Sequence, residues 1–332
     1  MTSLLIPVDA YLVESLPTVW FGVVMFTLAM YVALDGMDFG IGMLYATRDD
    51  HDRETLLSAF GPIWDANEVW LVAFGTTLLA AFPAIYSRLL SDRYLLAIAI
   101  VMALLMRGVA PELREQRDDS EWHRRCDQLF VFGSTVTPLL LGMLVGSWIF
   151  GTAAVSLPSL LTGVGLVALC LTSGAAFMAA KTSGPLSADM VRYGTASTAA
   201  YLAGVVVLLA VVYWLDPANV RALLVTLPAV AVVLASVVFG VGGVVAARQG
   251  RHKLWFGTTV GLSFLLVGLV ATLLYPTIYP VSGLTIDAVV VSPLALNLTT
   301  ILGLPVLLLV LWYFKFLYGT FAGPVDGEGY GT

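Results

Sequence analysis

Long stretches of this sequence contain no Asp, Glu, Lys or Arg, and they constrain the fold more than any other feature. They include residues 15–34, 69–87, 128–180 and 254–286. An α-helix that crosses a bilayer needs about 20 such residues, and it satisfies its own backbone hydrogen bonds in lipid. Apolar residues form 59% of the chain and charged residues only 11%. The sequence therefore predicts an all-α integral membrane protein, and it excludes a disordered chain because disorder requires low hydrophobicity.

The charge-free stretches divide into nine predicted spans, because turn residues at 151–158 split the longest stretch in two. They form one polytopic transmembrane bundle covering residues 1–332, with a short, flexible, Gly-rich tail at 319–332. The first span contains two aspartates and no small-residue cleavage site, which predicts a retained helix and not a signal peptide. The predicted spans are 18–46, 64–87, 92–110, 127–150, 159–180, 193–215, 223–247, 255–275 and 296–318.

Basic residues are distributed unequally between the two ends of these spans. Of the 16 Lys and Arg residues, thirteen fall toward one side and three, Arg88, Arg93 and Arg221, toward the other. Cytoplasmic loops are enriched in Lys and Arg. We therefore expect a multi-pass protein of the cell membrane with its N-terminus outside and its C-terminus in the cytoplasm. The net charge of −6 argues against a nucleic-acid partner, which requires a basic face.

The histidines and cysteines limit which cofactors the chain can hold. His51, His123 and His252 all fall in predicted cytoplasmic loops. A membrane haem is usually held by axial histidines from helices, so we expect this chain to bind no haem. A methionine within a span could in principle be a haem ligand, but single methionines in apolar helices are typical of packing. Cys126 and Cys170 lack metal-type spacing, so the sequence predicts no metal site.

Four acids fall within the first two spans. Asp35 and Asp38 are three residues apart on the first span, and Asp65 and Glu68 have the same spacing on the second. Each pair therefore shares one helix face. The two spans are antiparallel and joined by a predicted short loop near residue 50. Because a helix rises 1.5 Å per residue, we expect the four carboxylates at about the same depth on adjacent helices.

Further polar residues accompany these acids. Asn67 lies among them, and the third span brings Arg107 toward the same side, with Glu112 following. A charge inside the membrane costs at least about 2.5 kcal/mol, so such residues usually have a function. Desolvation and mutual repulsion favour the protonated form of some acids, and acids that share protons form natural relays. A purely structural cluster is the alternative, since Asp65 and Glu68 also suit a first helical turn.

Small residues flank the first pair of acids. Gly36, Gly40 and Gly42 lie on the same span, and Gly36 and Gly40 have the small-xxx-small spacing that lets membrane helices approach closely. We therefore expect a packing role for them.

Two segments carry a family resemblance. Residues 34–44 read LDGMDFGIGML and resemble the first-helix motif of subunit II of the cytochrome bd family of quinol oxidases. Residues 61–71 read GPIWDANEVWL and resemble the second-helix motif of that family. The segment 82–86 is also similar, and the motif-rich part covers residues 31–114. Glu68 stands where some members have Gln.

The resemblance implies a subunit of an enzyme that oxidises quinol and reduces dioxygen to water. It places the b- and d-type haems in subunit I, which would be the partner of this haem-free chain among the membrane lipids. It leaves the identity of the quinol and the presence of a small third subunit open. It further implies that a set of polar residues helps to conduct cytoplasmic protons toward the haem site. This set is Asp65, Asp35, Asp38, Glu68, Asn67, Arg107 and Glu112.

A second hypothesis is an independent proton-coupled transporter, whose acids would bind and release protons with a substrate. Transporters usually have broken helices or polar residues spread over several spans. Here the spans after residue 128 contain no intramembrane acid. This asymmetry favours a subunit that depends on a partner.

Overall fold

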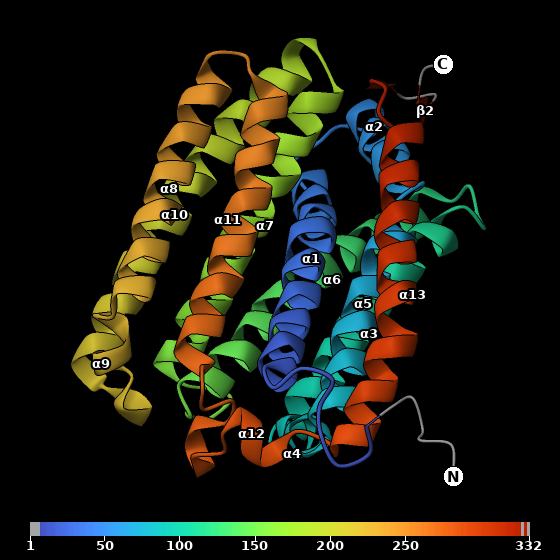
Figure 1. The fold of residues 1–332 in the computed structure, drawn as a ribbon. Coiled ribbons are helices and arrows are strands. Elements are labelled where there is room, and N and C mark those ends of the chain that lie inside the picture. The colour runs from blue at the N-terminus through green and yellow to red at the C-terminus, as the bar shows by residue number, and fades with distance from the viewer. Residues whose placement is uncertain (1–6, 327–328, 331–332) are drawn as a thin grey trace.

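The computed structural model describes residues 7–326 and 329–330, and most of them are helical (Figure 1). Two short 3₁₀ helices, η1 (Pro217–Asn219) and η2 (Pro280–Ser282), lie in connections. Two strands, β1 (Val325–Asp326) and β2 (Gly329–Tyr330), form an antiparallel pair. The α-helices are α1 (Leu16–Tyr45), α2 (Asp50–Phe60), α3 (Trp64–Ala81), α4 (Pro83–Ser91), α5 (Tyr94–Arg114), α6 (Ser120–Ile149), α7 (Leu157–Lys181), α8 (Gly184–Leu215), α9 (Arg221–Leu224), α10 (Leu227–Arg248), α11 (His252–Leu274), α12 (Ile286–Val289) and α13 (Pro293–Thr320).

A long helix stands at each of the nine predicted spans. Eight helices in the described part are long and apolar enough to cross a membrane: α1, α5, α6, α7, α8, α10, α11 and α13. The ninth, α3, has 18 residues and begins with polar side chains, so it does not reach this apolarity. The predicted span 64–87 is divided between α3 and α4 at Phe82. Pro83 lacks an N–H and therefore ends the α3 hydrogen-bond ladder.

Several helices begin earlier than predicted, and the loop near residue 50 is the helix α2. A carboxylate caps the N-terminus of α2 and of α6. Asp49 accepts a hydrogen bond from the Asp52 N–H of α2, and Asp119 accepts one from the Trp122 N–H of α6. The prediction that the histidines lie in loops is therefore wrong. All three lie in first helical turns, on α2, α6 and α11. The haem-free character of the chain stays a prediction.

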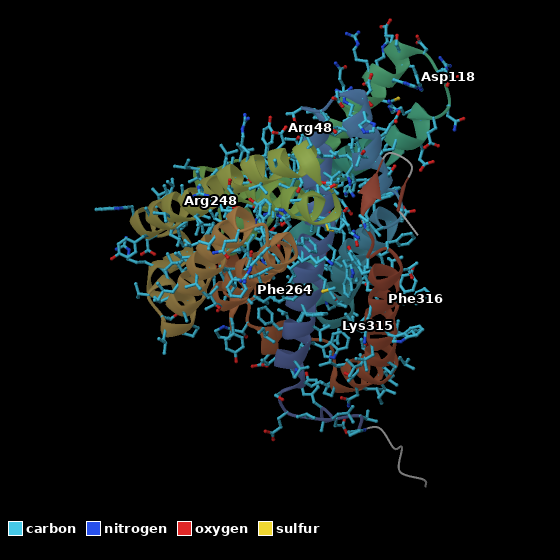
Figure 2. All side chains as sticks on the ribbon, turned by 90° about the horizontal axis from the view of Figure 1, so that it is seen from above. Arg48, Asp118, Arg248, Phe264, Lys315 and Phe316 are labelled. Atoms are coloured by element: carbon cyan, nitrogen blue, oxygen red, sulfur yellow. The ribbon has the colours of Figure 1, made fainter. Side chains whose placement is uncertain are left out.

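Helix α1 runs through the middle of the bundle and contacts α3, α6, α7 and α11 (Figure 1). Helices α7, α8, α10 and α11 lie on one side of it, and α3, α5 and α13 lie on the other. The outer helices expose large apolar side chains, such as Val238 on α10 and Leu302 on α13. Figure 2 shows the connection around Asp118, between α5 and α6, projecting from the bundle.

Close helix contacts are made at two of the three glycines flanking the acids. A Cβ atom at Gly40 would lie 2.1 Å from the Cys170 carbonyl oxygen of α7, and one at Gly42 would lie 2.0 Å from Ser134 Oγ of α6. At Gly36 the nearest atom would be Cys170 Sγ at 3.5 Å, an ordinary contact. The α1–α7 crossing therefore depends on Gly40 more than on Gly36.

One end of the bundle has few basic residues, and there a buried arginine links several segments of the chain by hydrogen bonds. Arg93 donates from Nε to Ser147 Oγ at 2.6 Å and from Nη1 to the Tyr279 hydroxyl at 3.0 Å. The Tyr279 hydroxyl donates in turn to Asp92. Burial and this hydrogen bond raise the pKa of the Tyr279 phenol, so it stays a neutral donor. The membrane orientation and the flexibility of the tail stay predictions, and residues 327–328 and 331–332 of that tail lie outside the described residues.

Candidate functional site

A polar cluster lies inside the bundle, where side chains from four helices meet. Helix α1 supplies Asp35 and Asp38, α3 supplies Asn67, α5 supplies Arg107 and α13 supplies Tyr318. The two aspartates and Asn67 are 0% exposed, and Arg107 is 1% exposed. Because these side chains are fully withdrawn from solvent, each depends on the others for its polar contacts.

One continuous series of contacts joins the cluster. Arg107 Nη2 lies 2.6 Å from Asp35 Oδ1 and 3.9 Å from Asp38 Oδ2. Asn67 Nδ2 donates to Asp38 Oδ2 at 2.8 Å. The Tyr318 hydroxyl donates to Asn67 Oδ1 at 2.9 Å. The amide of Asn67 therefore links the acidic residues of α1 to the last long helix of the chain.

Aromatic rings enclose the guanidinium of Arg107. Its Cζ atom lies 4.4 Å from the centroid of Phe39 and 5.6 Å from the centroid of Phe60, within cation–π range. Helix α6 packs closely against the backbone of α5 at this point: a Cβ atom at Gly133 would lie 2.6 Å from the backbone nitrogen of Arg107. Arg107 is thus held in position by packing as well as by charge.

The cluster has spare proton-binding capacity. Two carboxylates share one arginine, so the three groups are neutral together when they hold one extra proton. Among the described residues, Asp35 Oδ2, Asp38 Oδ1 and Arg107 Nε and Nη1 have no hydrogen-bond partner. Unpaired buried polar atoms are costly and are uncommon without a function. The arrangement can therefore accept a proton at a free carboxylate oxygen.

The remaining predicted residues lie outside this buried core. Asp65 is exposed in the first turn of α3, where it also suits the helix dipole. Glu68 is half-buried one turn further along and lies within electrostatic reach of both Asp35 and Asp65. Glu112 is exposed near the end of α5 and makes no ion pair within the described part of the chain. The structure thus brings four of the seven predicted residues together in the buried core. The other three lie nearer the protein surface.

Sequence reasoning missed three members of the site. Tyr318 lies 251 residues from its partner Asn67, and no local pattern in an apolar helix identifies it. Phe39 and Phe60 carry no charge or polar group that would set them apart in an apolar sequence. The neighbouring motif was the only signal, since Phe39 directly follows Asp38 within it.

The described residues offer no group of three or more His, Cys, Asp or Glu side chains that could hold a metal ion. The fold and the site thus define a polytopic helical membrane protein with an ionisable cluster enclosed by its helices. The chain belongs to the family described as cytochrome bd terminal oxidase subunit II, whose model matches residues 16–321.

Named relatives agree with this assignment. The chain is 34% identical over 189 residues to cytochrome bd ubiquinol oxidase subunit 2 of Bacillus subtilis, covering 52% of this chain and 55% of the relative. It is 29% identical over 192 residues to cytochrome bd-I ubiquinol oxidase subunit 2 of Escherichia coli K12, covering 52% and 51%. The matches therefore span about half the length of these relatives. A chain in the structure of bd oxidase from Geobacillus thermodenitrificans shares the fold, with a TM-score of 0.74 at 17% identity over 92% of this chain and 98% of that one.

Proposed function

We propose that this chain is the non-haem subunit II of a bd-type terminal quinol oxidase and that its cluster conducts cytoplasmic protons toward a haem-bearing subunit I. The haems expected in the partner would supply the redox chemistry of quinol oxidation and dioxygen reduction. The observation that carries the proposal is the buried pair of carboxylates sharing Arg107, with oxygens left free. Family membership of residues 16–321 supports the assembly.

The acids become progressively more exposed along the proposed path. Asp35 and Asp38 are fully buried, Glu68 is half-buried, and Asp65 is exposed. Cytoplasmic protons would be held at the aspartates, where Arg107 stabilises whichever carboxylate is ionised, and would pass through Glu68 to Asp65 and from there toward the partner. If this chain stood alone in the membrane, the exposed carboxylate of Asp65 would face lipid, which costs free energy. We therefore expect the partner subunit to cover Asp65.

The test replaces Asp65 by Asn in the complex purified through this chain. Asp65→Asn keeps the shape of the side chain but cannot carry a proton. We expect full haem content and a fall in turnover per haem of at least about tenfold, the scale of general acid–base steps. The matched control is Glu115→Gln, which neutralises an exposed acid at the end of α5 that is not among the residues of the proposed path. We expect its turnover per haem to stay near normal.

A purely structural cluster predicts a different order of effects. Haem content and assembly would then drop first, while turnover per remaining haem stayed normal. Measuring both quantities in one preparation separates the two explanations. Near-normal turnover in an intact Asp65→Asn complex would remove this residue from the path, and the absence of any co-purifying haem protein would favour the transporter alternative.

A further inference from the structure

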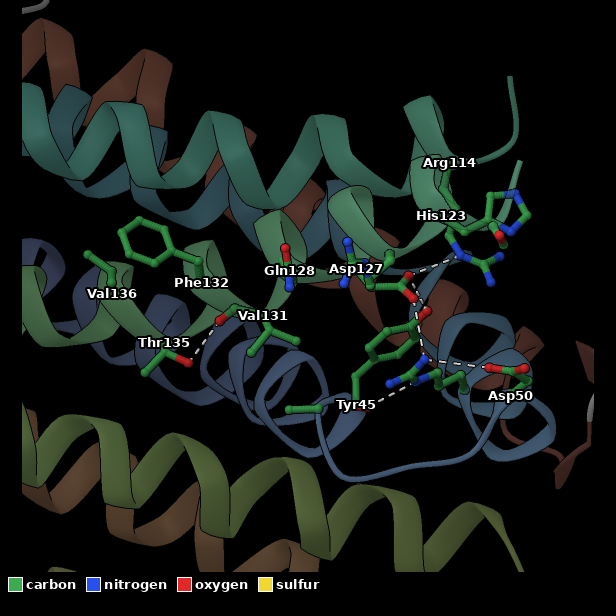
Figure 3. Close-up of a pocket in the computed structure, with 14 residues that line it drawn as sticks. Tyr45, Asp50, Arg114, His123, Asp127, Gln128, Val131, Phe132, Thr135 and Val136 are labelled. Carbon is green, nitrogen blue, oxygen red and sulfur yellow. Dashed lines mark hydrogen bonds and ion pairs between the residues drawn. The ribbon is translucent and has the colours of Figure 1, made fainter. Parts of the chain in front are cut away.

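A groove separate from the acidic cluster opens at the end of the bundle that is rich in arginine. It has a volume of about 760 Å³ and lies between the end of α1, the start of α2, the end of α5 and the first half of α6 (Figure 3). Its polar residues gather at one end and its apolar residues at the other. This distribution indicates an elongated amphipathic ligand.

The polar end is organised around one carboxylate. Asp127 accepts hydrogen bonds from the Tyr45 hydroxyl at 2.6 Å and from Arg114 Nε at 3.0 Å, and Arg53 Nη1 lies 3.4 Å from it. One carboxylate does not neutralise two guanidiniums. Asp50 offsets Arg53 only weakly, because it lies 3.5 Å away and its side chain is 91% exposed.

The charge balance of this end is positive. The lining holds three arginines and two aspartates, since Arg124 joins the pair around Asp127. Glu121 lies 4.0 Å from Arg124, but it is the closer partner of Arg125, at 2.7 Å, so the positive surplus remains. Within the described residues, Arg114 donates its side-chain hydrogen bond from Nε, to Asp127, and none from its two Nη atoms. Its planar fork therefore presents N–H groups that suit the oxygens of a phosphate.

The apolar end follows helix α6 into the bundle. Val131, Phe132, Thr135 and Val136 line it, and Phe132 is 52% exposed. At 1.5 Å per residue, the line from His123 to Val136 is about 20 Å long. This length accommodates a headgroup and the upper part of an acyl chain, and a small soluble anion would fill only the polar end.

We propose that this groove binds one anionic phospholipid, with its phosphate at Arg114 and Arg124 and one acyl chain along Phe132 and Val136. The polar end lies at the first turns of α6, and the apolar end lies further along the same helix. Headgroup and chain therefore follow the direction from membrane surface to membrane interior. The surplus positive charge favours an anionic lipid over a zwitterionic one.

The test uses native mass spectrometry of the delipidated complex purified through this chain. Phosphatidylglycerol and phosphatidylcholine with identical acyl chains are titrated in parallel, and inorganic phosphate is the third probe. We expect one phosphatidylglycerol to bind about tenfold more tightly than phosphatidylcholine, and inorganic phosphate to compete poorly. Equal binding of the two lipids, or equally strong competition by inorganic phosphate, would overturn the proposal.

Two neighbouring arginines supply a matched pair of variants. Arg124 lines the groove and Arg125 does not, although their side chains are similarly exposed, at 71% and 66%. We expect Arg124→Gln to weaken phosphatidylglycerol binding at least about threefold and Arg125→Gln to leave it unchanged. Equal effects would show non-specific attraction to a basic surface.

Two further variants address the two ends separately. Arg114→Gln should lower the affinity for phosphatidylglycerol at least about tenfold, because it removes a charge-assisted contact. Thr135→Trp fills the apolar end and should weaken lipid binding without changing the response to inorganic phosphate.

A photo-crosslinker at Gln128 tests the alternative occupant. If it captured the partner subunit and no lipid bound, a protein segment would occupy the groove and the proposal would be wrong.

Discussion

The crossing of α1 and α7 offers a prediction in which two glycines of one motif behave differently. A Cβ atom at Gly40 would lie 2.1 Å from the Cys170 carbonyl oxygen and 2.8 Å from the Gly174 Cα atom. Carbon and carbonyl oxygen normally approach to about 3.3 Å, so the helices must separate by about 1.2 Å. Both obstacles are backbone atoms and cannot rotate away. At Gly36 the added carbon would meet only Cys170 Sγ at 3.5 Å.

The energies follow from these distances. Replacing Gly by Ala in a helix contributes about 1 kcal/mol of stability through helix propensity. Overpacking of a close contact costs about 3 kcal/mol at the upper end of its usual range. Gly40→Ala should therefore destabilise the protein by about 2 kcal/mol, and Gly36→Ala should be neutral or stabilising by up to about 1 kcal/mol.

The native cysteines provide the assay. Cys126 and Cys170 are both buried, at 2% exposed each. A thiol-reactive fluorophore added during heating therefore reports when the helices come apart. We expect the midpoint to fall for Gly40→Ala and to stay or rise for Gly36→Ala. Equal midpoints for the two variants would refute the view that backbone contact at Gly40 sets the α1–α7 distance.

The remaining predictions concern topology, haem content and the buried arginine end. Single cysteines at the exposed positions Asp119 and Ala218, in a cysteine-free background, should label oppositely on intact cells: an impermeant reagent reaches position 218 and misses 119, and the reverse would defeat the orientation. The chain expressed without partners should show no Soret band, whereas stoichiometric haem on it would contradict the subunit assignment. Tyr279→Phe should lower stability by about 1 kcal/mol or more, since Arg93 and Asp92 lose a buried partner; an unchanged unfolding midpoint would show that the two pair without it.

The sequence located the helices well because each span is a long apolar stretch with polar ends. It was less accurate at the ends of the helices, where capping decides the boundary. Asp119 extends α6 seven residues beyond the predicted span by accepting the Trp122 N–H. Pro83 divides a predicted span although the residues around it remain apolar. Local hydrogen bonds and missing N–H groups determined these boundaries, and hydropathy does not register them.

The site was predictable only as far as intrahelical spacing reaches. The i,i+3 spacing places Asp35 and Asp38 on one face, and the cost of burying them indicated a function. Counting residues along the antiparallel spans placed Arg107 toward the same side of the membrane as these acids. The same reasoning grouped Asp65 with them, yet it points outward, because depth alone does not fix the rotation of α3 about its axis.

Rotation of α3 also determines what the buried core of the site can do. Asn67 lies two residues after Asp65, about 200° around the helix, and it faces inward to bind Asp38 while Asp65 faces out. The same turn of α3 therefore offers an exposed acid to a partner and a neutral amide to the buried acids. An acid in place of Asn67 would add a third carboxylate beside Arg107, and this core would then need a second proton to be neutral. A neutral amide at this position keeps the buried cluster one proton from neutrality, which is the condition that the proposed transfer of single protons requires.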